Sequence, residues 1–217
     1  MKHDLVVRLS PIDGLGAFAS RAFTRGAIIG TLRGRRTSAR ELGRRFLYGA
    51  RRVSCDPLQV DARAYLVLHP KYNAINHSCS PNAAIRGQRM LVAIRDISCG
   101  DEITFDYSAS EWSAEDYLHY DCDEWPMRCS CGEPECRKII ACFPCLASGL
   151  RKRYIATRLL QDHIRRRLGR INGGIRIKEA RCRVCDAILR QERLRAFRID
   201  HGRHLSAGAA AGKEPLR

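Results

Sequence analysis

Two stretches decide the fold of this chain: Asn76-His77-Ser78-Cys79-Ser80-Pro81-Asn82 and Gly100-Asp101-Glu102-Ile103-Thr104-Phe105-Asp106-Tyr107. The first is rich in side chains that donate and accept hydrogen bonds, and Pro81 stiffens its backbone. The second begins as a turn and continues as a short apolar strand. We therefore expect Tyr107 at the end of a strand, facing a cavity.

Working outward toward the amino terminus, Gly14-Leu15-Gly16 follows a short apolar segment. Glycine at positions 14 and 16 permits backbone conformations and close approaches that a Cβ would block. A loop of this kind can present its amides and carbonyls to a ligand. Taken alone, the same three residues also fit a plain hairpin turn.

Toward the carboxyl terminus, Cys129, Cys131 and Cys136 fall within eight residues. The amino terminus carries no signal-peptide pattern, so we expect an intracellular, cytoplasmic protein. Disulfides are disfavoured in the reducing cytosol, and closely spaced thiols then indicate a metal site. Three thiols leave tetrahedral zinc one ligand short.

Two further pairs have the Cys-x-x-Cys spacing, Cys142/Cys145 and Cys182/Cys185. Such pairs can meet in space and complete a second four-thiolate site. The first pair also fits a packing turn around Phe143, so independent buried thiols remain the alternative. We expect Cys55, Cys99 and Cys122 to be plain small residues.

The pattern of short apolar runs and frequent turns predicts a mostly β body. The expected strands are residues 5–9, 17–19, 27–30, 64–68, 90–94 and 102–105. Ser38 is a candidate cap for a helix reaching about Tyr48. Apolar residues from Leu150 to Leu168 approximate helical spacing, and residues 187–199 predict a second helix with a basic face.

Four segments in this order resemble the signature of SET-domain protein-lysine methyltransferases, in particular a small bacterial-type member. They are the Gly-x-Gly loop, the Asn-His-Ser-Cys-x-Pro-Asn heptapeptide, the Gly-Asp-Glu segment ending in Tyr107, and the post-SET Cys-x-Cys-x4-Cys cluster. The heptapeptide is specific, and the glycine loop alone is not. The resemblance implies a SET-type β-clip of short sheets with a pseudoknot, followed by a cysteine-rich loop and a small helical extension.

The resemblance also implies a division of the chain and a set of site residues. The expected regions are a SET domain at 1–110, a post-SET segment at 111–140, a basic helical extension at 141–204 and a tail at 205–217. Tyr107 would be catalytic, and S-adenosylmethionine would bind at Gly14, Leu15, Gly16, Ala17, Asn76, His77 and Tyr107. Zinc would be held by Cys79, Cys129, Cys131 and Cys136.

The chain departs from the family pattern at the lysine channel. Leu32-Arg33-Gly34 stands where the family often has Tyr-x-Gly, and Asn73-Ala74 replaces the usual Arg-Phe before Ile75. The product degree, mono-, di- or trimethylation, is therefore open. The candidate channel residues are Phe105, Tyr72 and Leu32, with Tyr48 as another ring that could fill the gap.

Charge is unevenly distributed over the 217 residues, which carry a formal net charge of +16. Residues 101–135 contain eleven acids and one Arg, whereas residues 151–198 contain sixteen basic residues and four acids. The resemblance implies that the acidic run from Glu111 through Asp116, Asp121, Asp123 and Glu124 lies near the channel mouth, where it would steer a basic, lysine-containing protein, such as a histone tail, toward the site. The basic extension would suit nucleic acid or be a solvated face, and no stretch has the length for a membrane span.

Two readings from other classes stay open at this stage. One is a catalytically inactive SET-type module that binds protein or nucleic acid. The other is a zinc-dependent DNA-binding regulator, which would show salt-sensitive DNA binding.

Overall fold

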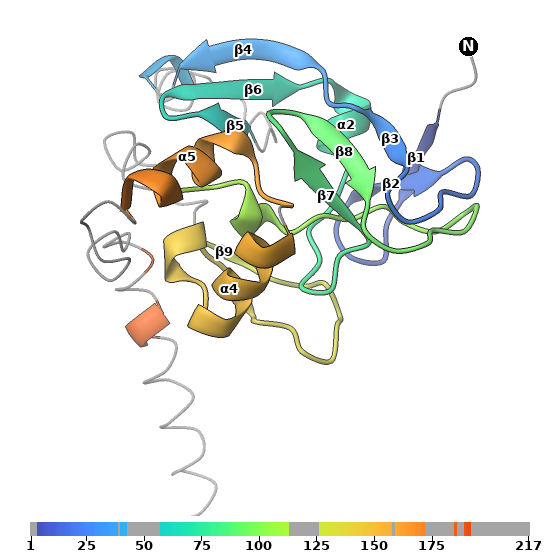
Figure 1. Cartoon of the computed structure of the whole chain (residues 1–217). Coiled ribbons are helices and arrows are strands. Elements are labelled where there is room, and N and C mark those ends of the chain that lie inside the picture. Colours follow the sequence, from blue (N-terminus) through green and yellow to red (C-terminus); the bar gives the residue numbers. More distant parts are fainter. Residues whose placement is uncertain are drawn as a thin grey trace, which may run out of the picture.

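The computed structural model describes residues 4–38, 40–42, 57–112, 126–157, 159–171, 185 and 189–191. Its described part is built mainly from small antiparallel sheets (Figure 1), which confirms the expected β class. Strand β1 (Leu5–Leu9) pairs with β2 (Leu15–Ala19), while β3 (Ile28–Thr31) and β7 (Ala83–Arg86) flank β8 (Met90–Ala93). Strands β4 (Gly34–Ser38) and β5 (Leu58–Asp61) flank β6 (Ala64–Leu68), and the short β9 (Met127–Arg128) pairs with β10 (Ile139–Ile140).

Short helices connect and cover these sheets. Helix α2 (Pro70–Asn73) follows β6, and the single turns η1 (Tyr107–Ala109) and η2 (Phe143–Cys145) lie further along the chain. Helices α4 (Ser148–Thr157) and α5 (Asp162–Ile171) come last, and α5 lies beside β5 (Figure 1). Among the described residues, no helix combines the length and apolar character that crossing a bilayer requires.

The segment 101–107 passes between β2 and the heptapeptide. The Ile103 N–H donates to the carbonyl of Ala17 (2.8 Å), and the Phe105 N–H donates to that of Asn76 (3.2 Å). The Ala83 N–H donates in turn to the carbonyl of Thr104 (2.9 Å). Segments far apart in the sequence thus cross at one place, as the expected pseudoknot requires.

The strand expected at residues 102–105 is wrong as a continuous strand. This segment forms isolated bridges, Phe18 with Glu102 (antiparallel) and His77 with Phe105 (parallel). The physical reason is that its partner changes along its length, so no single ladder extends over it. The change of partner is what joins the glycine loop to the heptapeptide.

The helical pattern from Leu150 to Leu168 belongs to two helices, not one. The connection between α4 and α5 is fixed to the turn between β7 and β8. The Gln161 Nε2 donates to the carbonyl of Gln88 (2.7 Å), and the Asp162 N–H donates to that of Gly87 (2.8 Å). These tertiary bonds take the chain out of helical geometry for one turn.

The helix expected after Ser38 is described only at its start. The Glu41 N–H donates to the Ser38 Oγ (3.2 Å), so the expected cap is confirmed. The body of that helix, including Tyr48, and most of the helix expected at 187–199 lie outside the described residues. Cys55, Cys122, Cys182 and the tail at 205–217 lie outside them as well.

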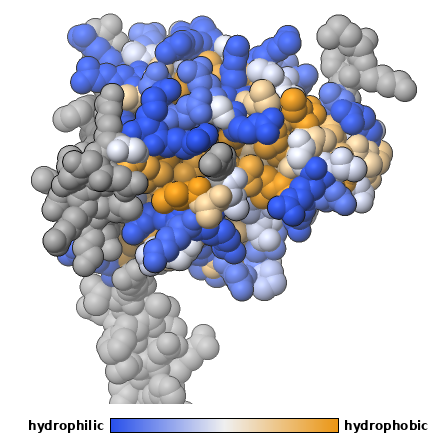
Figure 2. All heavy atoms as spheres, viewed as in Figure 1, coloured by the Kyte–Doolittle hydropathy of each residue, from blue (hydrophilic) through white to orange (hydrophobic). Residues whose placement is uncertain are grey.

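One main core lies under β1–β3 and β6–β8, and two smaller clusters surround η2. Figure 2 shows apolar residues reaching the surface in a band across this face, with hydrophilic residues above and below. The exposed apolar side chains include Leu9 (82% exposed) and Leu15 (54%), which are partners in the β1–β2 register. The ribbon that carries the glycine loop therefore presents an apolar surface.

Candidate active site and metal centre

Tyr107 lies where the segment 101–107 ends and η1 begins. Its hydroxyl donates a hydrogen bond to the carbonyl of Ile75 (2.7 Å), and its N–H donates to the His77 Nδ1 (3.1 Å). Its ring packs against Phe105 (4.8 Å between centroids) and His77 (5.5 Å). His77 of the heptapeptide therefore orients the backbone of the candidate catalytic residue, and Ile75, just before the heptapeptide, orients its hydroxyl.

The side chain of Asn76 joins the heptapeptide to the glycine loop. Its Nδ2 lies within hydrogen-bond distance of the carbonyls of Asp13 (3.1 Å) and Leu15 (3.2 Å), the Ser10 Oγ (3.0 Å) and the Glu102 Oε1 (2.8 Å). An amide nitrogen has two protons, so these acceptors share them. The glycine loop, Asn76 and the Gly-Asp-Glu motif thus meet around one amide.

Each glycine of the loop has its own structural reason. Gly14 has φ +44°, a conformation that L side chains rarely adopt, and a Cβ there would meet no atom within 4 Å. At Gly16, a Cβ would lie 2.4 Å from the Glu102 Oε1. Gly14 therefore makes a turn beside open space, and Gly16 leaves room for the carboxylate that accepts from Asn76.

His77 is buried and held at both ring nitrogens. Because its Nδ1 accepts from Tyr107, the ring proton is on Nε2, which lies 3.4 Å from the Cys79 Sγ and can donate to it. Burial lowers the pKa of His77 to about 4, and Asp106 opposes this shift only in part. The imidazole is therefore neutral at neutral pH, and it links the tyrosine to a sulfur of the thiol cluster.

The four expected zinc ligands come together. The sulfurs of Cys79, Cys129, Cys131 and Cys136 all lie within 4.8 Å of one another. The Sγ atoms of Cys79 and Cys129 are 3.8 Å apart, and a tetrahedron with Zn–S bonds of about 2.3 Å has edges of roughly 3.8 Å. The donor set and its spacing therefore fit zinc.

The protein backbone also supports these sulfurs. The Arg137 N–H donates to the Cys79 Sγ (3.4 Å), and the Lys138 N–H donates to the Cys136 Sγ (3.4 Å). Burial alone would raise the pKa of Cys131, but hydrogen bonds from the backbone of Cys79 and Glu133 help to lower it to about 7. A thiolate is the form that binds a metal, and the backbone contacts favour it at Cys131. Burial raises the pKa of Cys79 to about 11 and that of Cys129 above its ordinary value, so these two thiolates depend on the charge of a bound metal.

Arg137 connects the thiol cluster to the catalytic segment. It immediately follows Cys136, and its guanidinium donates to both oxygens of Asp106 (2.8 and 2.6 Å). Burial alone would lower the pKa of Arg137, but the hydrogen bonds and charge of Asp106 raise it above its ordinary value. Asp106 immediately precedes Tyr107, so this buried ion pair fixes the metal loop against the residue before the tyrosine.

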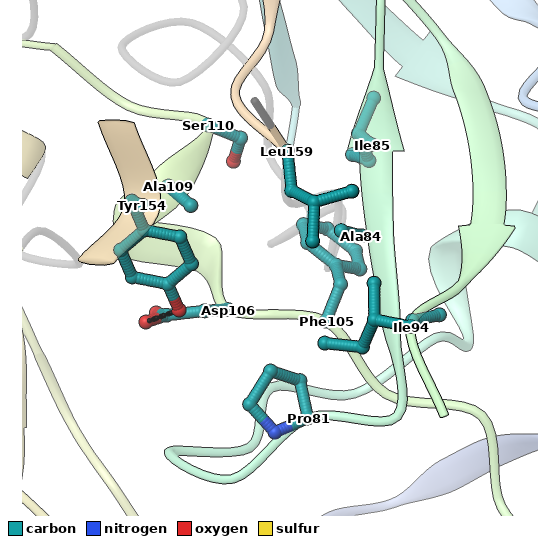
Figure 3. Close-up of a pocket in the computed structure, with 11 residues that line it drawn as sticks. Pro81, Ala84, Ile85, Ile94, Phe105, Asp106, Ala109, Ser110, Tyr154 and Leu159 are labelled. Carbon is teal, nitrogen blue, oxygen red and sulfur yellow. Dashed lines mark hydrogen bonds between the residues drawn. The ribbon is translucent and has the colours of Figure 1, made fainter. Parts of the chain in front are cut away.

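Helix α4 contributes to the same carboxylate. The Tyr154 hydroxyl donates to the Asp106 Oδ2 (2.6 Å), and burial together with that carboxylate raises the pKa of Tyr154 above its usual range. Figure 3 shows Tyr154 pointing at Asp106 across one end of a small cavity, which Phe105, Ile85 and Leu159 also line. Tyr107 is not among the residues that line this cavity, which lies behind the catalytic segment.

The candidate channel residues have mixed positions. Phe105 (6% exposed) contacts Tyr107, whereas Leu32 (0%) and Tyr72 (8%) belong to the main core. Their channel role stays a prediction. Glu111, the first member of the acidic run, is 5% exposed, so its expected place on an acidic surface is wrong; the rest of the run at 113–125 lies outside the described residues.

Sequence reasoning missed Glu102, Asp106 and Arg137 as individual contributors. Each lies beside a recognised residue: Glu102 within the Gly-Asp-Glu motif, Asp106 before Tyr107, and Arg137 after the last clustered cysteine. What marks each of them in the sequence is a charged side chain within or beside a motif and close to apolar residues. A charge buried there without a partner would lower the stability of the fold. The sequence did not tell which of these charged side chains would form ion pairs or hydrogen bonds with which partners.

The comparisons with known proteins agree with this geometry. Residues 14–108 match the model of the SET domain, so this part of the chain is a SET domain. The match begins at the glycine loop and ends one residue after Tyr107. The match therefore covers the glycine loop, the heptapeptide and the segment 101–107 that passes between them, and it leaves out the thiol-rich segment and the extension.

Curated relatives are similar to about a third of the chain. A histone-lysine N-methyltransferase, H3 lysine-36 specific, of Candida albicans is 40% identical over 73 residues, which are 30% of this chain and 8% of that protein. An H3 lysine-4 specific enzyme of Schizosaccharomyces pombe is 41% identical over 70 residues, 29% of this chain and 6% of that protein. The methyltransferase flvH of Aspergillus flavus is 32% identical over 82 residues, 36% of this chain and 41% of that protein.

This chain therefore spans less than a tenth of the two histone-lysine enzymes. Among solved structures, ctPRC2 in an autoinhibited conformation bound to S-adenosylmethionine is similar at a TM-score of 0.45 and 20% identity, over 51% of this chain and 16% of that one.

Proposed function

We propose that this protein is a lysine N-methyltransferase that transfers a methyl group from S-adenosylmethionine to a lysine side chain of a basic protein. The observation that carries the proposal is the meeting of Tyr107, Asn76 and the glycine loop within a SET domain. The glycine loop supplies backbone carbonyls, open space beside Gly14 and the exposed Leu15, which fit a ligand with both apolar and polar parts. The bound cofactor would supply an electrophilic methyl group on a sulfonium.

The Tyr107 hydroxyl would orient the lysine nitrogen. Because its proton is donated to the Ile75 carbonyl, the oxygen presents its lone pairs as acceptors. An amine that donates a proton to this oxygen directs its own lone pair away from the ring. Alignment of that lone pair with the methyl carbon is the main requirement of an in-line displacement, and alignment in well-oriented models contributes roughly 7–11 kcal/mol.

The lysine must also lose its proton. Free lysine has a pKa of about 10.4, so it is mostly an ammonium at neutral pH. A partly desolvated position beside the Tyr107 hydroxyl, close to the positive sulfonium, would lower that pKa. No general base is required of the described residues if the amine is deprotonated before or as it enters.

His77 and Arg137 would act as positioning residues. The His77 imidazole accepts from the Tyr107 backbone and faces a zinc ligand, and Arg137 binds the carboxylate of the residue before Tyr107. The zinc loop would therefore hold the tyrosine through two independent contacts. The cluster has a role in closing the active site as well as in stability.

The substrate class is proposed from charge and from the relatives. The relatives named above include histone-lysine methyltransferases, and residues 113–125 carry five acids and no Lys or Arg. Such a segment would attract a basic peptide by steering rather than by tight binding. The arginine-rich extension would hold nucleic acid associated with that peptide.

The test compares wild-type protein with Tyr107→Phe on a panel of basic proteins and labelled S-adenosylmethionine. Removal of one positioned polar group at a reacting centre is expected to lower kcat about 10²–10³-fold. Cofactor affinity, measured by calorimetry, and zinc content should stay unchanged. Mass spectrometry should place the label on lysine in the wild-type reaction.

Three outcomes would contradict the proposal. Absence of cofactor binding and of transfer would favour an inactive SET-type module. Equal rates in both proteins would remove Tyr107 from catalysis. Label on a residue other than lysine would change the reaction class.

A further inference from the structure

Outside the centre described above, two cysteines from distant parts of the chain lie together. Cys142 lies two residues after the end of β10, at the start of the extension, and Cys185 lies 43 residues later, in its last part. Their sulfurs are 3.4 Å apart, and both residues are fully buried. We propose that they belong to a second zinc site, completed by Cys145 and Cys182, which fixes the extension to the SET domain.

The first centre provides an internal reference for this pair. There, two sulfurs lie 3.8 Å apart, and backbone N–H groups donate to sulfur at 3.4 Å. At the second pair, the Cys142 N–H donates to the Cys185 Sγ at 3.5 Å. The same two features, sulfurs at metal-ligand spacing and an amide pointing at a sulfur, thus recur in one chain. Such amide contacts stabilise a thiolate.

Cys145 is held close to this pair by a turn. Its N–H donates to the carbonyl of Cys142 (2.9 Å), which closes the Cys-x-x-Cys segment as the single turn η2. Cys145 also packs against the cluster that contains both buried cysteines. A metal needs only to draw the Cys145 sulfur onto the existing pair.

The fourth ligand follows from the sequence spacing. Cys182 precedes Cys185 by three residues and lies outside the described residues. The two pairs together have the donor set of a closed structural zinc site, with four thiolates and no position for water. Within the described part of the chain, only the first centre brings four sulfurs together.

The position of the pair explains what a metal there would do. The surrounding cluster contains Tyr65 of β6, Ile139 of β10 and Leu42, with Leu189 of the extension packed against it. The ribbon β9–β10 leads from Cys129, at the first centre, to Cys142 at the second. Zinc at both ends of this ribbon would anchor the part of the extension that follows α5. Among the described residues of that part, Cys185 and Leu189 belong to the apolar clusters.

The test counts zinc in the full-length chain, purified under reducing conditions, by elemental analysis and native mass spectrometry. The expected content is two zinc ions per chain. Cys185→Ser and Cys145→Ser should each lower it to one, and Cys79→Ser should also lower it to one by emptying the other centre. Cys99→Ser is the matched control, because Cys99 is exposed and belongs to neither set; it should retain two.

A second measurement does not depend on the folding of variants. In the wild-type protein, cobalt titration should give tetrahedral thiolate absorption that saturates at two equivalents, and thiol alkylation should leave all eight ligand cysteines unmodified until a chelator is added. Saturation at one equivalent would overturn the proposal. A Cys142–Cys185 disulfide in the reduced preparation, or iron with sulfide in place of zinc, would overturn it as well.

Discussion

The SET core at residues 4–112 and the cysteine-rich region from residue 126 onward are held together by different forces. The core has strands of four or five residues and a continuous apolar cluster. The Asn82 side-chain amide also donates a hydrogen bond to the backbone of the segment 101–107. The later region begins with strands of only two residues, its first segment brings four sulfurs together, and a separate apolar cluster packs η2 against α5. We expect the first region to assemble from the chain alone and the thiol-rich segment 126–140 to depend on a bound metal for its order.

Metal removal should separate the two regions most strongly. Structural zinc in small thiolate sites contributes an apparent 10–16 kcal/mol or so of binding free energy. After treatment with a strong chelator, we expect amides of residues 126–140 to lose nearly all protection in hydrogen exchange, while β6 to β8 keep theirs. Methyl transfer should be lost and should return with zinc but not with magnesium. Equal loss of protection in both regions would contradict the comparison.

The next largest effect is expected where the two regions meet, at Asp106. Asp106→Ala leaves Arg137 partly buried without its partner, which typically costs about 3–5 kcal/mol. Urea unfolding should report this loss. Tyr154→Phe removes one hydrogen bond to the same carboxylate and should cost only about 1 kcal/mol. If the two variants were equally stable, the ion pair would not be the connection between the regions.

Asn82 of the heptapeptide binds the segment 101–107. Variants of Asn82 test whether this part of the core is stable without support from the metal region. Its Nδ2 donates to the Glu102 carbonyl (2.8 Å), and its Oδ1 accepts from the Thr104 N–H (2.9 Å). Asn82→Ala leaves two buried backbone groups unpaired and should cost about 2–4 kcal/mol. Asn82→Asp keeps the acceptor but sets an oxygen against the Glu102 carbonyl in a buried position, so it should not restore the lost stability. Zinc content should stay unchanged in both variants, and a loss of zinc would show that the core depends on the metal region.

A smaller effect than that of Asn82→Ala is expected from pH. Burial, followed by the charge of Arg167, lowers the pKa of His163 to about 4, and its Nε2 lies 3.2 Å from the carbonyl of Ser110. The unfolded chain binds this proton near pH 6.5 and the folded chain does not, so stability is present above pH 6.5 and is lost as pH falls toward 4. The loss should reach about 2 kcal/mol by pH 5.

Thermal denaturation between pH 7.5 and 5 checks this prediction, with His163→Gln as the control. The variant should show a shallower decrease, because glutamine does not titrate. The same slope in both proteins would assign the pH dependence to other groups.

The sequence predicted those site residues whose chemistry depends on a fixed spacing along the chain. Gly16, Asn76, Tyr107 and the four clustered cysteines were found because their chemistry is tied to fixed spacing. The strand at 102–105 was wrong because local pattern does not say that a segment changes partners along its length. The single helix at 150–168 was wrong because the bonds of Gln161 are tertiary.

The contacts of Asp106 could not be predicted for a different reason. Its partners Arg137 and Tyr154 are 31 and 48 residues away, and three separate elements must fold before they meet. No periodicity in the sequence records such a meeting. Only the cost of leaving a charge unpaired in an apolar stretch hinted that a partner existed.

The crossing of segment 101–107 also has a kinetic consequence. Phe18 and Glu102 pair although 84 residues separate them, and contacts of such long range form slowly because the loop between them must first be closed. Tyr107 lies at the end of this segment, which we expect to close late because its partners are distant in the sequence. Chains that have formed their local hairpins but have not yet placed this segment would be compact and without methyl-transfer activity. The rate at which activity returns during refolding would therefore report the rate at which this segment is placed.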